Sequence, residues 1–287
     1  MWWFFSLLSA LAQVSRNIIM KDLGHKLDEY INVWGRFTFL LPFAISASLY
    51  AKLPAVDSRY WLYSLAAGLS QVIATSLLAK ALKYGDISMS IAIWKLHVLF
   101  ILILGVFLLN EKVTPLGITG IIFSLFGVYL LNVKKAHVSL AEPILLLFKD
   151  KALRYALLAA ITVSPTILLF KRTAQLSDPY FACFTNHVFA SLFTLPLVLK
   201  NSTHKLTKVP KHLGKFLLLG LFASAATIFG NLAYVASVSS YVEAVKQVEI
   251  LLALVAGFIF FKEREKIKEI GPGCIIITAG VLILVFA

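Results

Sequence analysis

The sequence predicts an all-α integral membrane protein with ten transmembrane helices in two inverted repeats of five. Three observations predict this fold: the apolar composition, the spacing of the apolar segments and an internal repeat. Of the 287 residues, 60% are hydrophobic and 14% are charged, whereas soluble domains average about 45–50% and about 25%. With a mean hydropathy of +0.86, the chain has too little polar surface to cover itself in water, so we expect a lipid bilayer to surround it.

The apolar segments are long enough to cross a bilayer. A spanning helix needs about 20 mostly apolar residues. Short polar breaks divide the sequence into ten such segments: 2–20, 31–51, 60–82, 87–109, 113–133, 152–170, 180–199, 213–235, 238–261 and 267–287. The first contains Gln13, Arg16 and Asn17 and no basic leader, so we expect the first helix of the mature protein there and not a cleaved signal peptide.

The basic residues indicate which way the helices cross. The net charge is +13, but Lys and Arg are spread over short loops and form no single arm or stripe, which argues against nucleic acid as a partner. Eighteen of the 27 lie in loops on one side of the predicted topology and five on the other: Lys52, Arg59, Lys112, Lys171 and Arg172. Positive loops face the cytoplasm. We therefore expect a multi-pass protein of the cell (inner) membrane with both termini outside.

Sequence motifs for enzymatic chemistry are missing. The two cysteines, Cys183 and Cys274, lie in apolar segments and are too few for a disulfide framework or a four-cysteine zinc site. The sequence has no GxxxxGK[ST] phosphate loop, no HExxH zinc helix and no complete nucleophile elbow. We therefore expect no cofactor, no bound metal and no enzymatic activity.

The two halves of the sequence match each other at an offset of about 150 residues. Asp28 and Tyr30 correspond to Asp178 and Tyr180, and further matches follow in order: Glu111-Lys112 with Glu263-Arg264, and Gly120 and Gly127 with Gly273 and Gly280. Five helices per half is an odd number, so the second half enters the membrane in the opposite orientation, as in many secondary transporters. The predicted division is a first repeat over 1–135, a connecting loop over 136–151 and a second repeat over 152–287. A duplication kept only for packing is the alternative.

Short motifs at the ends of the fourth and ninth segments carry a family resemblance. Ala81-Leu82-Lys83-Tyr84-Gly85 precedes the fourth segment and Asn110-Glu111-Lys112 follows it, with Ala233-Tyr234 and Lys262-Glu263-Arg264 as the counterparts in the second half. With ten spans and a glycine-spaced fifth helix, the chain resembles EamA-type members of the drug/metabolite transporter superfamily. The resemblance implies that helices one to four and six to nine line a central cavity. It also implies cytoplasmic termini, whereas the lysine count predicts the opposite, and we keep the prediction from charge.

Ionisable residues inside the fourth and ninth segments form the best candidate for a binding site. A charge in the hydrocarbon core costs roughly 2.5–3.5 kcal/mol, so each is a candidate for function. The fourth segment contains Trp94, Lys95 and His97, and the ninth contains Glu243, Lys246, Gln247 and Glu249. An offset of 152 aligns the two stretches, so pseudo-symmetry predicts that they face each other. The alternative is a structural network in which Lys246 only neutralises Glu243 or Glu249.

Three further segments contain polar residues at helical spacing. The first has Gln13, Arg16 and Asn17, the second has Asn32 and Arg36 near Trp34, and the seventh has Asn186 and His187 at the place equivalent to Arg36. Arg16 is close enough to its helix end to reach the interface, and His187 fits a packed histidine as well as a cavity role. We include Asn17, Trp34 and Arg36 among the substrate-binding residues.

The fifth and tenth segments contain glycines in place of ionisable residues. Gly117, Gly120 and Gly127 in one, and Gly271, Gly273 and Gly280 in the other, allow two helix backbones to approach closely. We expect these helices to pack together and not to line a cavity. In the sixth segment, Ser164-Pro165 predicts a kink, either static or a flex point.

These residues predict a secondary transporter or exchanger that moves a small polar metabolite by alternating access. A site that contains cationic side chains together with two carboxylates suits a zwitterionic ligand such as an amino acid. Lys95 and Arg36 would bind its acidic group, and Glu243 would bind its amine. Glu243, Glu249 and His97 are candidates for carrying a coupled proton, and a counter-substrate is equally consistent. The alternatives are a flippase for a lipid or lipid precursor, an exporter of organic cations or drugs, and an intramembrane enzyme. Monomer and homodimer stay open.

Overall fold

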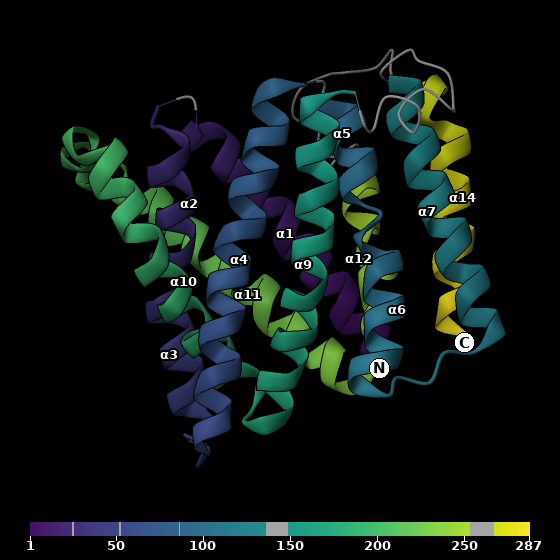
Figure 1. Cartoon of the computed structure of the whole chain (residues 1–287), viewed down its shortest axis with the longest axis horizontal. Helices are drawn as coiled ribbons and strands as arrows, with labels where there is room; N and C mark the ends of the chain where they lie inside the picture. Colours follow the sequence, from purple (N-terminus) through teal and green to yellow (C-terminus); the bar gives the residue numbers. More distant parts are fainter. Residues whose placement is uncertain (25, 52, 86, 136–148, 253–266) are drawn as a thin grey trace. The chain divides into compact units, whose positions relative to one another are not determined.

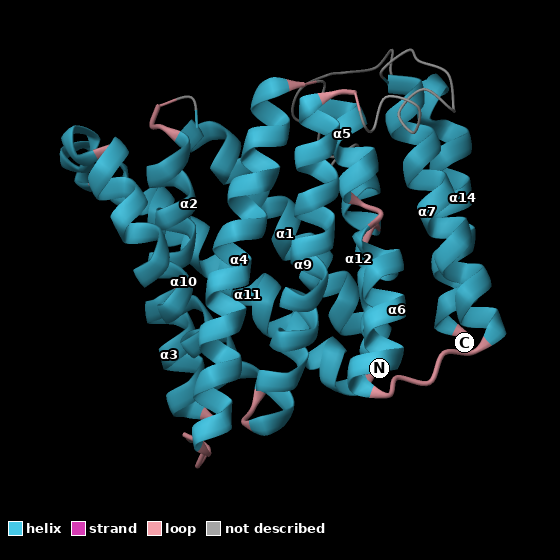
Figure 2. Ribbon diagram, viewed as in Figure 1, coloured by secondary structure: helices cyan, strands magenta, loops and turns pink. Residues whose placement is uncertain are grey.

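The computed structural model of the chain describes residues 1–24, 26–51, 53–85, 87–135, 149–252 and 267–287. Every regular element in these residues is a helix, and short loops join the helices (Figure 2). Five segments are long and apolar enough to cross a membrane: Ser58–Tyr84, Met89–Leu109, Lys151–Leu176, Pro179–Asn201 and Pro210–Ala236. Shorter apolar helices cover Pro115–Leu130 and Gly273–Val285. The chain is therefore an all-α membrane protein, and its count of ten spans stays a prediction.

The helices follow the predicted segments in order along the chain (Figure 1). Seven helices each cover one segment: α1 (Trp2–Gly24), α4 (Ser58–Tyr84), α7 (Pro115–Lys135), α9 (Lys151–Leu176), α10 (Pro179–Asn201), α11 (Leu213–Ala236) and α14 (Ile267–Val285). Two segments are divided, into α2 (Glu29–Thr38) and α3 (Leu41–Tyr50), and into α5 (Ile87–Trp94) and α6 (His97–Leu109). The ninth contains α12 (Ser239–Lys246) and a helix that resumes at residue 248. The 3₁₀ turns η1 (Thr203–Lys208) and η2 (Pro210–His212) precede α11.

The chain forms two compact units, and each combines segments from both halves of the sequence. Unit 1 contains Met1–Val72 and Leu169–Ala236, and unit 2 contains Ile73–Leu168 and Ser237–Ala287. Two of the three unit boundaries fall inside α4 and α9, and the third lies between α11 and α12. The predicted repeats follow sequence order and so divide the chain differently. The predicted connecting loop lies mostly outside the described residues, as do Glu263 and Arg264.

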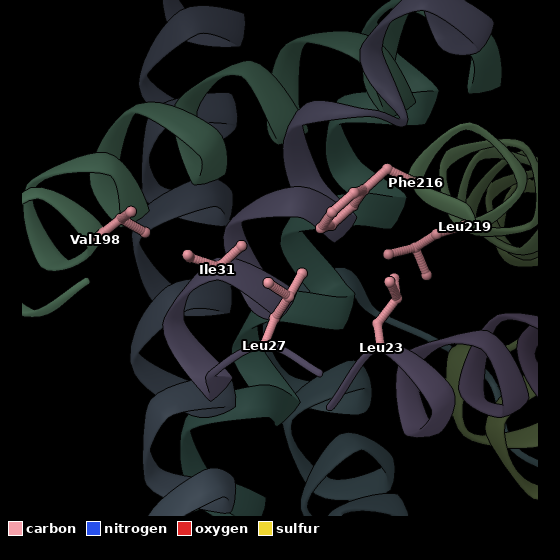
Figure 3. Close-up of a cluster of buried hydrophobic side chains, with 6 residues drawn as sticks. All are labelled: Leu23, Leu27, Ile31, Val198, Phe216 and Leu219. Carbon is pink, nitrogen blue, oxygen red and sulfur yellow. The ribbon is translucent and has the colours of Figure 1, made fainter. Parts of the chain in front are cut away.

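In unit 1, α1 packs on α11, and α10 packs on α2 and α3. A cluster of buried side chains from α1, α2, α10, α11 and the α1–α2 loop forms a core, shown in Figure 3: Leu23, Leu27, Ile31, Val198, Phe216 and Leu219. Gly35 lies against this core, and a Cβ atom there would come within 2.2 Å of the Phe216 ring. The absent side chain therefore lets α2 approach α11.

The repeat match between Asp28 and Asp178 has a structural cause in unit 1. Each aspartate is the N-cap of a helix, Asp28 of α2 and Asp178 of α10. Asp28 Oδ1 accepts a hydrogen bond from the Ile31 amide at 3.0 Å, and Asp178 Oδ1 accepts from the amides of Tyr180 and Phe181 at 2.8 and 2.9 Å. A side-chain acceptor is needed there because the first amides of a helix have no partner within it. The repeat thus preserves the start of an equivalent helix in each half.

The division between α2 and α3 results from Pro42 in the first turn of α3. Proline has no amide hydrogen, and its ring clashes with the carbonyl of the residue four positions earlier, so a continuous helix is disfavoured there. The backbone at the break approaches α11 closely, because a Cβ on Gly220 would lie 1.9 Å from the Phe39 carbonyl oxygen. The counterpart Pro196 lies inside α10, which continues past it.

In unit 2, α7 and α14 lie side by side (Figure 1). Of the glycines predicted to pack there, Gly120, Gly127, Gly273 and Gly280 do so, whereas Gly117 lies against the Tyr241 ring of α12. A Cβ on Gly280 would lie 2.5 Å from the Ser124 amide nitrogen, and one on Gly127 would lie 2.9 Å from the Gly273 carbonyl oxygen. The two backbones are therefore in contact, as in other small-residue helix pairs.

The Asn110-Glu111 motif closes α6 and starts α12. Asn110 has φ of 52°, a left-handed conformation that asparagine tolerates better than most residues. The turn brings the Glu111 side chain to α12, where its Oε1 accepts hydrogen bonds from the Ser239 amide at 3.0 Å and the Ser239 hydroxyl at 2.7 Å. Glu111 thereby supplies the cap that Val238, the residue at the N-cap position, cannot provide.

Candidate functional site

The fourth predicted segment is broken in its middle, between α5 and α6. Figure 2 shows a short loop there. The Val98 amide donates to the Lys95 carbonyl three residues earlier, at 3.4 Å, and His97 Nδ1 lies 2.9 Å from the Trp94 carbonyl oxygen. In a continuous helix that carbonyl would accept from Val98. The histidine side chain therefore enters the helical ladder and interrupts it without proline or glycine.

The ninth segment is broken in the same way after Lys246. The Gln247 amide donates to the Ala244 carbonyl three residues earlier, at 3.2 Å, and the Ile250 amide donates to the Gln247 carbonyl at 3.0 Å. Bonds of this kind tighten the helix into a 3₁₀ turn. The helix resumes at Val248.

The two breaks occur at equivalent positions of the repeat. The offset of 152 that aligns the polar stretches places Trp94 on Lys246 and Lys95 on Gln247. Trp94 is the last residue of α5, and Lys246 is the last residue of α12. Lysines near both helix ends suit the partial negative charge of a helix C-terminus. Broken helices of this kind form the binding sites of many transporters with inverted repeats.

The structure brings the charged residues of the two polar stretches together within unit 2. Lys95 Nζ forms an ion pair with Glu249 Oε1. Lys246 Nζ lies 2.6 Å from Glu243 Oε1, and His97 Nε2 lies 3.3 Å from Glu243 Oε2. All five side chains are at most 13% exposed. We call these five residues the unit 2 charge network, and its pairing offsets the cost of removing each ion from water.

Trp94 forms one wall of the unit 2 charge network. The centroid of its ring lies 4.9 Å from Lys95 Nζ and 5.1 Å from the centroid of the His97 ring. A lysine over an indole face is a cation–π contact. The ring of Trp94, one of the predicted substrate-binding residues, is therefore in contact with a cation of the protein itself.

The hydrogen bonds of His97 fix where protons lie in the network. Nδ1 faces the Trp94 carbonyl oxygen and must carry a proton to make a favourable contact. Nε2 faces Glu243 Oε2, so this contact is favourable only when one of the two atoms is protonated.

Gln247 lies beside the network with half of its amide unsatisfied. The side chain is 1% exposed. Ser124 Oγ on α7 lies 3.0 Å from Gln247 Oε1 and 3.1 Å from the Ala244 carbonyl oxygen, and its single proton can serve one of them. Gln247 Nε2 has no hydrogen-bond partner among the described residues. A buried amide without a partner is uncommon and marks a place where a ligand or water can bind.

Of the site residues predicted in unit 1, Asn17 and Arg36 lie in a basic region of α1 and α2. Asn17 Oδ1 accepts hydrogen bonds from Arg16 Nε and Nη2 at 3.2 and 3.0 Å. The Arg36 guanidinium lies 5.3 Å from the centroid of the Phe37 ring. Arg16 is 7% exposed, and Arg36 is partly exposed.

Trp34 and His187 have packing roles in unit 1. Trp34 packs against the core cluster, with its ring edge-on to Phe39 at 6.4 Å between centroids. His187 is 2% exposed and lies between the rings of Phe37 and Phe170, and its Nδ1 is 2.9 Å from the Cys183 carbonyl oxygen. Of the two roles predicted for His187, these contacts favour the packed histidine.

The structure adds serines that sequence reasoning did not assign to the site. The hydroxyl of Ser124, on the glycine-spaced helix α7, lies within hydrogen-bonding distance of Ala244 and of Gln247, on the two sides of the α12 break. Ser164 Oγ lies 3.2 Å from the His97 carbonyl oxygen and 2.7 Å from that of Ala160. In the sequence, a serine in an apolar segment cannot be distinguished from other small residues that serve only packing. Only knowledge of where the helices break could have identified these serines. The described residues contain no cluster of three or more His, Cys, Asp or Glu that could hold a metal ion.

The fold matches a solved structure described only as the crystal structure of a protein. The two share 16% sequence identity with a TM-score of 0.71, over 99% of this chain and 96% of that chain. At this identity the match shows a common fold and nothing about activity. No curated protein matches the chain.

A family comparison covers both halves of the sequence. The sequence profile described as the EamA-like transporter family matches residues 1–133 and again residues 150–286. The two matches leave out only the region between the repeats and the last residue. The chain belongs to the EamA-like transporter family.

Proposed function

We propose that this membrane transporter moves a small polar metabolite with an acidic group and an amine, such as an amino acid, by alternating access. In this proposal the chain has ten spans in two inverted repeats, 1–135 and 152–287. The lysine distribution supports a location in the cell (inner) membrane with both termini outside. Family membership supports transport itself.

The observation that carries the proposal is the unit 2 charge network at two equivalent helix breaks. Its ion pairs join α5–α6 to the ninth segment through Lys95 with Glu249 and through His97 with Glu243. Five ionisable groups at low exposure are costly, and apolar residues of similar volume would pack at least as well. The presence of these ionisable groups at broken helices favours a role in binding.

A zwitterion can enter the network by exchanging partners with it. Its carboxylate would replace Glu249 at Lys95, and its amine would replace Lys246 at Glu243. The free amide nitrogen of Gln247 would donate to the ligand as well. The displaced Lys246 and Glu249 are three residues apart in the sequence and would pair with each other. Each charge would then keep an opposite charge beside it, so binding avoids the cost of an isolated buried ion.

The His97–Glu243 pair is the proposed proton carrier. A substrate amine that binds Glu243 would compete with a proton shared between these two residues. Substrate and proton therefore compete for the same site. Glu249 is the second candidate, because a substrate carboxylate that replaces it at Lys95 would leave it available to bind a proton. In this scheme, collapsing the pH gradient abolishes accumulation of substrate.

The test is flux of radiolabelled amino acids, other zwitterions and organic anions into proteoliposomes of purified protein. Glu243→Gln keeps the shape of the side chain but removes its charge, and we expect at least a tenfold loss of flux. Exposed Glu29 provides the matched control Glu29→Gln, which should keep full flux. Gel filtration and thermal stability report whether each variant is folded. Full flux in a folded Glu243→Gln protein would show that the site assignment is wrong.

A further inference from the structure

We propose that the connection between α10 and α11 in unit 1 binds an anionic phospholipid of the surrounding membrane. Lys208 and Lys211, which we call the lysine pair, bind the phosphate of the lipid, and exposed leucines at the start of α11 contact its acyl chain. The inference goes beyond the proposed function, because this lipid is a bound component of the membrane and not the transported metabolite.

The connection folds into two consecutive 3₁₀ turns, η1 and η2. The Val209 amide donates to the Leu206 carbonyl at 3.0 Å, and the His212 amide donates to the Val209 carbonyl at 3.0 Å. In a 3₁₀ helix, side chains three residues apart lie above one another, and the rise is about 2.0 Å per residue. Lys208 and Lys211 are three residues apart, so they follow each other on one side of the turns, about 6 Å apart along the axis.

Packing against the protein decides which side of these turns faces outward. Leu206 and Val209, which are also three residues apart, pack against the buried core cluster of unit 1. They hold one side of the turns against the protein. Lys208 and Lys211 lie on another side and are exposed, so both ammonium groups are available to a ligand.

Carboxylates of unit 1 neutralise the lysines before and after the lysine pair. Lys205 Nζ lies 3.4 Å from Asp28 Oδ2, and Lys215 forms an ion pair with Asp22. The stretch 200–215 contains five lysines and no acidic residue. Within the described part of the chain, the lysine pair makes no ion pair. The positive charge of the connection is therefore left uncompensated at the lysine pair.

The connection lies where lipid head groups are expected. It joins Pro179–Asn201 and Pro210–Ala236, two segments that are long and apolar enough to cross a membrane. Leu213, Leu217 and Leu221 follow on α11 and are 46%, 40% and 43% exposed. Residues four apart are neighbours on a helix surface, so this leucine stripe leads from the lysine pair into the apolar segment. A phospholipid has the same order of groups, a phosphate followed by acyl chains.

The charge of the lysine pair selects an anionic head group. A lysine near a surface of anionic lipids strengthens binding about fivefold. A zwitterionic lipid carries its own cation beside the phosphate and so gains less from the lysine pair. A soluble phosphate has no acyl chain for the leucine stripe. Charge and apolar surface together therefore favour an anionic phospholipid over both.

The experiment measures thermal unfolding of the detergent-solubilised full chain, titrated with phosphatidylglycerol, with phosphatidylcholine of the same acyl chains and with glycerol 3-phosphate. A ligand that binds the folded state raises the unfolding midpoint. We expect saturable stabilisation by phosphatidylglycerol, at least tenfold weaker binding of phosphatidylcholine and no stabilisation by glycerol 3-phosphate. High salt should weaken the binding of phosphatidylglycerol, because the charges that attract it are exposed.

Variants of the lysine pair assign the site. Lys208→Gln/Lys211→Gln should weaken binding of phosphatidylglycerol at least tenfold, because two contributions of about fivefold are lost. Lys208→Arg/Lys211→Arg keeps both charges and should retain binding. The matched control Arg59→Gln/Arg172→Gln removes two exposed charges of the same unit from loops predicted on the other side of the membrane. It should bind phosphatidylglycerol like the natural protein.

Three results would overturn the inference. These are equal stabilisation by phosphatidylglycerol and phosphatidylcholine, stabilisation by glycerol 3-phosphate as strong as that by the lipid, and unchanged lipid binding by folded Lys208→Gln/Lys211→Gln protein. That variant retains every residue of the unit 2 charge network, so its lipid binding and its flux of zwitterions can be measured separately. Loss of lipid binding therefore tests this site, and the flux assay with Glu243→Gln tests the proposed function.

Discussion

The two compact units differ in what their buried positive charges contact. In unit 2, Lys95 lies against Glu249 and Lys246 against Glu243, with both carboxylates at low exposure. In the described residues of unit 1, the Arg36 guanidinium lies against the ring of Phe37, 5.3 Å from its centroid. The carboxylates that unit 1 does pair, Asp22 and Asp28, lie at helix ends. The described positive charges of unit 2 are therefore neutralised by carboxylates of the protein itself, whereas Arg36 in unit 1 lies against an aromatic ring.

The largest expected effect is from breaking a balanced pair. Lys95→Met should lower the free energy of unfolding by about 3–5 kcal/mol, because Glu249 loses its cation while buried. Thermal unfolding in detergent measures this as a lower midpoint. Adding Glu249→Leu should recover most of the loss, since an apolar pair replaces the ion pair. Equal stability of the single and double variants would mean that the pair is not coupled.

Removing the unbalanced charge should change stability in the opposite direction. Arg36→Met should raise the free energy of unfolding of ligand-free protein by about 1 kcal/mol, because an uncompensated guanidinium leaves an apolar span. The exposed control Arg172→Met should change it little. If Arg36→Met is instead destabilised as much as Lys95→Met, then Arg36 has a counter-charge and the contrast between the units fails.

The smallest effect comes from the surface carboxylate Asp28. Burial favours the neutral form, but the nearby Ser202 hydroxyl, the hydrogen bond from the Ile31 amide and the ion pair with Lys205 outweigh it and lower the pKa of Asp28 below its ordinary value. A lowered pKa in the folded state gives stability that is present above about pH 4 and is lost as the pH falls through the folded value. Asp28→Asn keeps the helix cap, so the stability difference between the two proteins should vanish on acidification. We expect well below 1 kcal/mol at neutral pH, and a difference that persists in acid would contradict the assigned charge effect.

Much of the fold follows from the sequence because apolar length and repeat spacing are local signals. In the described residues the segment boundaries agree with the helices to within a few residues, except that α9 runs to Leu176, beyond the predicted end at residue 170. The match of Asp28 with Asp178 has a physical cause in two helix caps. The contact of the glycines on α7 and α14 was also predictable, because small residues have few other uses at that spacing.

The helix breaks and the pairing of charges were not predictable in the same way. Pro42 makes the break before α3 predictable from the sequence. No proline or glycine lies between α5 and α6, where the side chain of His97 competes for a backbone carbonyl. The sequence offered Lys246 two acidic partners on its own helix, Glu243 and Glu249, and the structure pairs Glu249 with Lys95. Which of several possible partners a charge takes depends on helix rotation, which periodicity alone does not fix.

The helix breaks also have a consequence for hydrogen exchange. Amides in spanning helices are ordinarily protected for long times, whereas those with long or strained hydrogen bonds open more readily. The Val98 amide, with its 3.4 Å bond, and the amides beside Gln247 should therefore exchange early within otherwise protected stretches. Because these amides surround the unit 2 charge network, their exchange rates can report when the network is occupied, with no label attached to the protein or its ligand.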